Sequence, residues 1–233
     1  MADSDHKLYH IEFYEDRITT TVTGSPHIVD QWINETYYLH GTGSHEMNLF
    51  VGLDTEWRFD PEAHDYQVAI IQLCDVRRRC LIFQFSQQTQ TGEIVNNAPP
   101  HSLTTFLADQ NISFVGKQVK EDVKRLARLG LHVSRAVDVS HMAAEKYRDK
   151  SHRCKGLKTL AMEFLNKEMN KHKDITLSRW DVEQLSLAQV EYACIDAFVS
   201  LRLGILLSTT NDQLDHHHPI NDIKQSQHAA LSS

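Results

Sequence analysis

The chain has 233 residues, of which 41% are hydrophobic and 24% charged, and a formal net charge of -7. This length supports one well-covered α/β core and is short for two domains. No run of eighteen apolar residues occurs, and the first ten residues contain neither the basic nor the apolar stretch of a secretion signal. We therefore expect an intracellular protein, cytoplasmic or nuclear, that is neither secreted nor embedded in a membrane.

The charge is unevenly distributed along the chain. Residues 117–158 contain twelve Lys or Arg against five Asp or Glu, a local charge of +7 that leaves -14 for the rest. Such a segment is either a set of solvated helix faces or a surface that follows a phosphate backbone. Composition alone leaves both interpretations open.

The four cysteines are widely spaced. They form no CxxC pair, so the sequence indicates neither a zinc knuckle nor a disulfide framework. We expect reduced and mostly buried thiols.

The N-terminal part predicts a hairpin followed by a helix. Residues 8–23 alternate in polarity, are rich in β-branched and aromatic residues, and contain a short charged turn. Ser25 or Pro26 opens a helix that continues to about Leu39. We expect this extension, residues 1–47, to pack on the edge of the core.

The next segments predict a mixed sheet covered by helices. Three strands joined by short turns are expected to be antiparallel, over residues 48–57, 67–74 and 79–85. A polar loop, 87–100, and a short helix that begins at Leu103 follow. Two more strands are expected at 113–116 and 136–139, and further helices at 119–130, 142–147, 157–165 and 187–207. The core thus spans residues 48–207 and has five strands.

The C-terminal segment, residues 208–233, is polar and contains His216, His217 and His218. Histidine runs without further ligands at fixed spacing are more often disordered than metal-binding. We expect a disordered tail.

Asp54 and Glu56 are the first candidates for chemistry. They lie two residues apart at the end of an apolar run, so both side chains leave the same face of a strand. Two such anions repel each other unless a cation lies between them, and Mg²⁺ prefers carboxylate oxygen. The pair alone is also common on solvated strands, but its place at the end of a buried strand favours a metal site.

Asp122, Tyr192 and Asp196 complete the set of candidates. Asp122 lies in the first turns of a helix, where a carboxylate also stabilises the helix dipole. Tyr192 and Asp196 are four residues apart on one helix face, a spacing that also suits a half-buried hydrogen-bonded pair. Each residue taken alone leaves these structural alternatives open.

Taken together, three segments resemble the exonuclease motifs of the DEDD superfamily. They are LDTEW at 53–57, VGKQVKED at 115–122 and YACIDA at 192–197. The tyrosine four residues before the last aspartate is similar to that of the DEDDy branch. Residues 68–74, together with four positions nearer the C-terminus, resemble the Werner-type exonuclease domain; these are Leu157, Leu160, Trp180 and Leu187.

The N-terminal extension is similar to the small stand-alone plant members of that group, at residues 18–23 and 29–33. Some of those members are single-stranded RNA exonucleases in small-RNA pathways, and some form rings. The resemblance therefore implies RNA in preference to DNA as substrate, and it leaves open a homo-oligomer and small-RNA pathway proteins as partners.

The resemblance also implies a ribonuclease-H-like (DnaQ-like) fold and hydrolysis from the 3′ end with two Mg²⁺ or Mn²⁺ ions. Asp54 would bridge both ions, Glu56 and Asp196 would complete one, and Asp122 would hold the second through water. Tyr192 would orient the attacking water. The products would be nucleoside 5′-monophosphates.

Six residues near these motifs are candidates for binding the substrate. Lysines and an arginine in and just after the second motif would contact the backbone, and the tryptophan that ends the first motif would stack on a terminal base. These residues are Thr55, Trp57, Lys117, Lys120, Lys124 and Arg125.

Three alternatives stay open at this stage. The first is an endonuclease of the same fold, which would lack the tyrosine spacing. The second is a DNA exonuclease in repair. The third is a catalytically silent nucleic-acid-binding scaffold, whose signature would be a missing carboxylate, and none of the four is missing here.

Overall fold

The computed structural model describes residues 5–41, 49–60, 64–89, 91–170 and 173–209. Seven strands form one mixed sheet in the order β1-β2-β5-β4-β3-β8-β9. They are β1 (His6–Phe13), β2 (Asp16–Thr23), β3 (Leu49–Asp60), β4 (Asp65–Cys74), β5 (Arg79–Gln84), β8 (Ile112–Gly116) and β9 (Ala136–Asp138). Strand β4 is antiparallel to both of its neighbours, β3 and β5, whereas β8 runs parallel to β3 and β9 runs parallel to β8.

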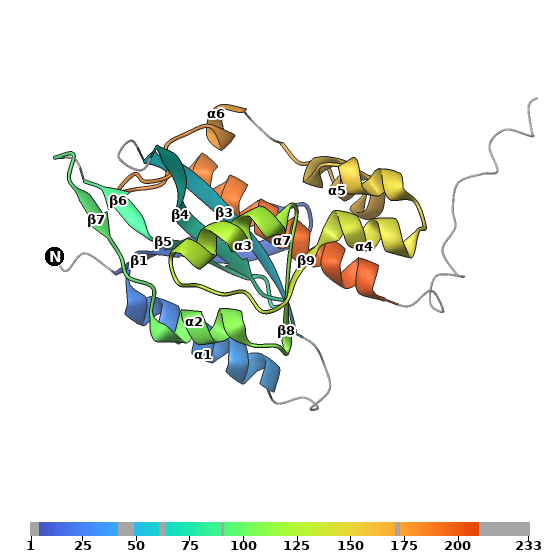
Figure 1. The fold of residues 1–233 in the computed structure, drawn as a ribbon, viewed down its shortest axis with the longest axis horizontal. Coiled ribbons are helices and arrows are strands. Elements are labelled where there is room, and N and C mark those ends of the chain that lie inside the picture. Colours follow the sequence, from blue (N-terminus) through green and yellow to red (C-terminus); the bar gives the residue numbers. More distant parts are fainter. Residues whose placement is uncertain (1–4, 42–48, 61–63, 90, 171–172, 210–233) are drawn as a thin grey trace, which may run out of the picture.

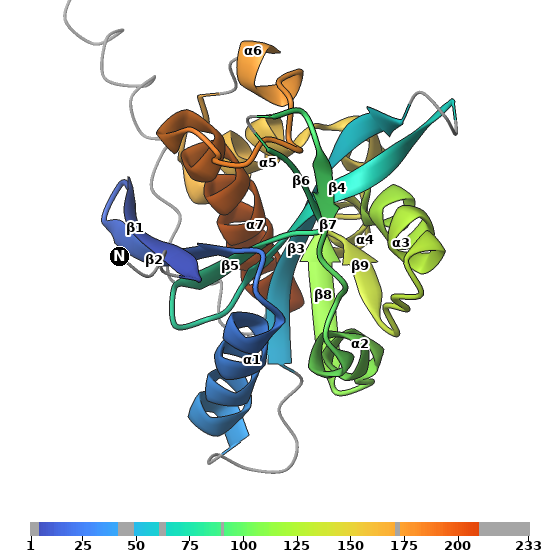
Figure 2. The same cartoon turned by 90° about the vertical axis from the view of Figure 1, so that its left-hand side faces the viewer.

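Helices cover both faces of the sheet (Figures 1 and 2). One face is covered by α4 (Val139–Lys146), α5 (Leu157–Leu165) and the long α7 (Leu187–Ser208). The other face is covered by α1 (Pro26–Gly41), α2 (His101–Ala108) and α3 (Val119–Arg128). Two short helices, η1 (Lys150–Cys154) and α6 (Lys173–Thr176), lie in the connections between the longer ones. The sheet therefore separates two apolar cores.

The central strand β3 contributes to both cores because successive side chains of a strand point to opposite faces. Val51 and Leu53 are fully buried in the core beneath α1, α2 and α3. Gly52 faces α7 so closely that an added Cβ would lie 2.0 Å from the carbonyl oxygen of Ala197. A glycine at this position is what allows α7 to pack directly on the strand.

The structure confirms the three consecutive antiparallel strands and the alternating helices and strands that follow them. It corrects the size of the sheet, which has seven strands rather than five. The predicted N-terminal hairpin does not only pack on the edge, because β2 pairs in parallel with β5 and so extends the same sheet. The division of the chain at residues 47 and 207 stays a prediction.

The polar loop predicted over 87–100 is wrong in part. It contains most of a small two-stranded sheet of β6 (Ser86–Gln88) and β7 (Ile94–Asn96). Gly92, at a φ of +88°, lies in the turn between the two strands. Strands of three residues are too short to show the alternation by which a sequence reveals a strand.

The structure also describes the four cysteines and the apolar character of the helices. All four thiols are free; Cys74, Cys80 and Cys194 are buried, as expected of most of them, and Cys154 is exposed. Among the residues that the structure describes, no helix has the length and apolar character needed to cross a membrane. The predicted disordered tail lies almost entirely outside the described residues.

The contact at Gly52 leads to a stability prediction. Gly52→Ala would force the new methyl group against the α7 backbone, and overpacking of this kind costs about 1–3 kcal/mol. Urea denaturation followed by circular dichroism measures the change. Gly156→Ala is the matched control, since a Cβ there meets no described atom within 4 Å. Equal stability of the two variants would contradict the close approach of α7 to β3.

Candidate active site

Asp54 and Glu56 occupy the face of β3 that Gly52 turns toward α7. Both alternate with Leu53 and Thr55, which are buried on the opposite face, and both are partly exposed. A register shift between β3 and β4 follows immediately, between Glu56 and Trp57. Irregularities of this kind are frequent beside active sites, where they change the direction of a side chain. The two predicted metal ligands of the first motif thus share one face.

Tyr192 and Asp196 lie on α7. This helix begins with a capping box in which Ser186 and Gln189 bond each other's backbone N–H. Asp196 is 4% exposed, and the ring of Tyr192 lies 5.9 Å from that of the fully buried Trp180. The tyrosine is therefore held from one side by the core.

A cleft of about 440 Å³ opens beside these two α7 residues. The tip of the N-terminal hairpin also lines this cleft, through Glu12, Phe13 and Tyr14. Tyr14 is 56% exposed, and its hydroxyl accepts a hydrogen bond of 2.8 Å from the backbone N–H of Glu168. Tyr14 is not among the residues predicted from the sequence, because nothing local to a hairpin turn indicates which distant segment it will contact.

Asp122 contacts β3 on the face opposite to Asp54 and Glu56. It lies in the first turn of α3, is 4% exposed, and accepts a 2.5 Å hydrogen bond from the hydroxyl of Thr55. Burial raises the pKa of Asp122 to about 7, although the bond from Thr55 opposes the rise. The four carboxylates are thus divided between the two faces of the strand.

Thr55 is itself held by Trp57, whose indole N–H donates to the threonine oxygen at 2.7 Å. The guanidinium of Arg125 lies 4.1 Å from the centre of the Trp57 ring and donates to the carbonyl of Tyr66 at 2.8 Å. A second contact, of 3.7 Å, joins Arg125 to Asp65. A continuous chain of contacts therefore runs from Arg125 through Trp57 and Thr55 to Asp122.

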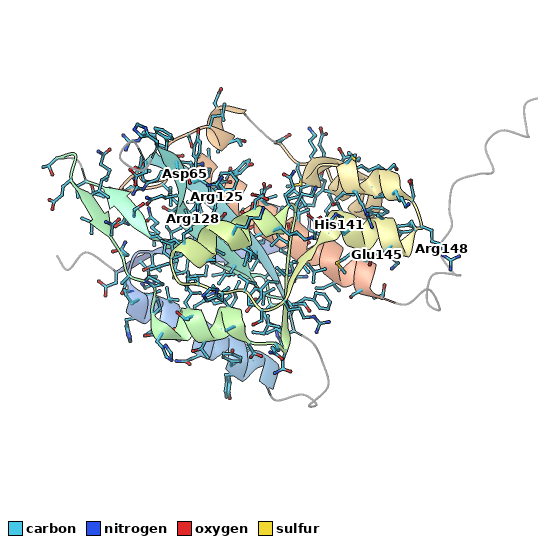
Figure 3. The ribbon with its side chains drawn as sticks, viewed as in Figure 1. Asp65, Arg125, Arg128, His141, Glu145 and Arg148 are labelled. Carbon is cyan, nitrogen blue, oxygen red and sulfur yellow. The ribbon has the colours of Figure 1, made fainter. Side chains whose placement is uncertain are left out.

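Figure 3 shows Arg125 and Arg128 of α3 beside Asp65, which precedes Tyr66 at the start of β4. One face of Trp57 and the charge of Arg125 are thus engaged within the protein. Their predicted roles in stacking on a base and in contacting the backbone stay predictions.

The three lysines predicted to contact the backbone lie in and just before α3. Lys124 is paired with Glu121 at 2.6 Å, and both side chains are largely exposed. Lys120 is exposed, and Lys117 is half-buried. Their predicted substrate contacts also stay predictions.

A model of the family described as "3'-5' exonuclease" matches residues 27–209. The chain belongs to the 3′-5′ exonuclease family. A 3′-5′ exonuclease of Arabidopsis thaliana is 30% identical over 167 residues, a match that covers 70% of this chain and 54% of that relative. The chain thus spans about half the length of this exonuclease.

Two solved structures share the fold. Brucella melitensis NrnC with bound Mg²⁺ aligns with a TM-score of 0.53 and 23% identity, covering 68% of this chain and 71% of that one. RNase D of Escherichia coli, an exoribonuclease involved in structured RNA processing, aligns with a TM-score of 0.59 and 17% identity, covering 80% and 44%. These likenesses confirm the ribonuclease-H-like exonuclease fold that the three motifs predicted.

The raised pKa of Asp122 leads to a prediction about the metal-free exonuclease. An exposed aspartate has a pKa of about 3.9. Between about pH 4 and pH 7 the folded protein therefore keeps a proton at Asp122 that the unfolded chain has lost, so this residue makes stability fall as the pH rises through that window. Asp122→Asn removes the titration and keeps an oxygen that accepts from Thr55.

Urea denaturation in EDTA at a series of pH values measures the effect. We expect the stability of the wild type minus that of Asp122→Asn to decrease from pH 4 to pH 7 and then to level off. A difference that is constant, or that increases over this range, would show that Asp122 is ionised in the folded metal-free protein.

Proposed function

We propose that the protein is a metal-dependent 3′-to-5′ exonuclease that releases nucleoside 5′-monophosphates from single-stranded nucleic acid, with RNA preferred over DNA. The observation that supports this most is the placing of all five motif residues around one strand. Asp54 and Glu56 lie on the face of β3 turned toward α7, which carries Tyr192 and Asp196, and Asp122 is bonded to the same strand through Thr55. Membership of the exonuclease family supports the reaction class.

The donor set fits Mg²⁺ or Mn²⁺. All four ligands are carboxylates, and hard divalent ions prefer oxygen. Asp122 also suits a cation site. Burial favours its neutral form, so this carboxylate ionises readily only beside a cation. We propose that Asp54, Glu56, Asp122 and Asp196 would together hold two such ions. The bound Mg²⁺ of NrnC supports the choice of metal.

When bound, paired ions lower the pKa of an attacking water and stabilise a leaving oxygen. The protein's own residues do the rest. Tyr192 is held against Trp180 and orients the attacking water through its hydroxyl. Phenols stay protonated at neutral pH, so we assign Tyr192 an orienting role and no role as base.

We place the 3′ end of the strand in the cleft between the N-terminal hairpin and α7. Tyr192 and Asp196 line this cleft, and its volume of about 440 Å³ falls in the range of small-ligand pockets. The preference for RNA rests on the sequence resemblance and on the likeness to RNase D, an exoribonuclease. A homo-oligomer and small-RNA pathway partners stay predictions.

One observation favours a second candidate, the silent scaffold. Within the part of the chain that the structure describes, no three His, Cys, Asp or Glu side chains are grouped so that they could hold a metal ion. Asp122 is bonded to Thr55 on one face of β3, and it would have to act through water or turn toward Asp54 on the other face. Activity of the purified protein decides between the two.

The deciding experiment follows one RNA strand labelled at its 5′ end and the same strand labelled at its 3′ end. We expect a ladder from the first and immediate release of a mononucleotide from the second, in Mg²⁺ or Mn²⁺. EDTA should abolish both, and Ca²⁺ should not replace Mg²⁺, because its coordination is looser. Internal cuts would indicate an endonuclease, and an intact strand with every metal would indicate a scaffold.

Variants in the same assay separate the roles of the residues. Asp54→Asn should be the most damaging, since it weakens the binding of both ions, whereas Tyr192→Phe removes one hydroxyl and should cost about 10²-fold or less. Glu93→Gln, which changes an exposed carboxylate of the β6–β7 turn, is the control and should keep full activity. A fully active Asp54→Asn would show that the reaction takes place elsewhere.

The two lysines of α3 provide a test of the phosphate-binding surface. We expect Lys120→Ala to reduce the slope of log affinity against log salt by roughly one unit. Lys124→Ala should change the slope less, because Glu121 already neutralises this lysine. Fluorescence anisotropy with labelled RNA measures both slopes. Unchanged slopes in both variants would mean that these lysines form only a solvated helix face.

A further inference from the structure

Gln72 of β4 is fully buried, and neither its amide nitrogen nor its amide oxygen has a hydrogen-bond partner among the described residues. A buried polar group left unpaired costs about 1–3 kcal/mol. Buried side-chain amides in proteins are therefore nearly always bonded, and the exceptions often have a functional reason.

The position of Gln72 indicates that reason. In the antiparallel ladder of β3 and β4, Gln72 is the direct partner of Asp54. Side chains directly opposite each other leave the same face of the sheet, with Cβ atoms about 4.5–5.5 Å apart. On its other side Gln72 pairs with Ile82 of β5, which offers no polar atom. Asp54 is therefore its polar neighbour across the ladder.

The neighbours of Gln72 along β4 on this face are apolar. Ile70 and Cys74, the residues two before and two after it on β4, belong to the core under α7. A leucine or methionine would suit such a position better than an amide. The packing of the core thus gives no reason for a glutamine here.

A second buried glutamine shows how this sheet treats an amide with a structural role. Gln84 of β5 donates to the carbonyl of Val182 at 3.0 Å and accepts from the amide of Gln87 at 2.9 Å. Its side chain joins β5 to β6 and to the connection that precedes α7. Gln72 makes no such link within the described residues.

We propose that Gln72 is a positioning residue for Asp54. When the site holds its metal ions and substrate, the amide nitrogen of Gln72 donates to the carboxylate of Asp54 and fixes the direction in which that carboxylate points. An amide N–H₂ group is a donor and an ionised carboxylate only accepts, so the pair is complementary. The inference rests on the proposed function, since it assigns Asp54 a role that needs a fixed orientation.

The free-energy cost of burying the unpaired amide is then offset when metal ions and substrate bind, because the amide gains a hydrogen-bond partner. Groups that orient a metal ligand typically change metal affinity or activity by 10- to 100-fold when they are removed. In the metal-free protein the same amide is only a burden on stability. Removing the amide should therefore raise the stability of the metal-free protein and lower metal affinity. A residue with only a structural role would not produce this combination.

The test is Gln72→Leu, an apolar side chain of similar size. We expect the thermal unfolding midpoint of the metal-free protein to rise, because the unpaired amide is removed. We also expect Mn²⁺ affinity, measured by titration calorimetry, and single-turnover degradation of RNA each to fall about 10- to 100-fold. In an Asp54→Asn background, Gln72→Leu should cause no further loss of Mn²⁺ affinity, since Gln72 acts through Asp54.

Gln84→Leu is the matched control, and we expect it to lower the unfolding midpoint and to leave Mn²⁺ affinity unchanged. The proposal is overturned if Gln72→Leu lowers stability as Gln84→Leu does, or if it changes neither Mn²⁺ affinity nor degradation. An additional loss in the Asp54→Asn background would also overturn it. If the wild type degrades no strand, the proposed function fails, while the unfolding midpoint and the Mn²⁺ affinity still decide the role of Gln72.

Discussion

The direct packing of α7 on β3 is the contact on which the geometry of the site depends. With no side chain at Gly52, the backbone of Ala197 can lie against the strand. This contact fixes both the distance of α7 from the sheet and its rotation, because a turned helix would present a side chain where only a carbonyl fits. Asp196 precedes Ala197, and Asp54 follows Gly52 by two residues on the same face. One glycine thereby sets the relation between two of the proposed metal ligands.

Two buried polar side chains beside Asp54 and Thr55 are less well satisfied than a buried carboxylate at the far end of β4. Asp75, in the turn between β4 and β5, is fully buried and accepts from the backbone of Arg77 and from both the backbone and the side chain of Arg79. Asp122 is buried with the hydroxyl of Thr55, and the amide of Gln72 has no partner among the described residues. Proteins commonly lose stability at functional sites in this way. Asp75 shows that this fold can supply a buried carboxylate with several hydrogen bonds at a position outside the proposed site.

The basic segment has a more mixed character than its charge indicates. Arg125 is packed on Trp57 and bonded to the β4 backbone, Arg128 pairs with Asp65, and Lys124 pairs with Glu121. Part of the local excess of positive charge therefore joins α3 to the hairpin of β3 and β4. The contacts of Arg125 extend through Trp57 and Thr55 to Asp122. This arginine therefore both joins α3 to the β3–β4 hairpin and supports a proposed metal ligand.

The sequence by itself determined the family, the three motifs and most of the core elements, because apolar periodicity and motif spacing are local properties of the chain. It could not reveal that β2 joins β5, that the tip of the hairpin forms a wall of the cleft, or that Arg125 lies on Trp57. Nor could it distinguish Gln72 from Gln84, which are both glutamines in apolar strands. Those features depend on which residues meet across the sheet. Strand register and helix packing decide this, and both are established only in the folded chain.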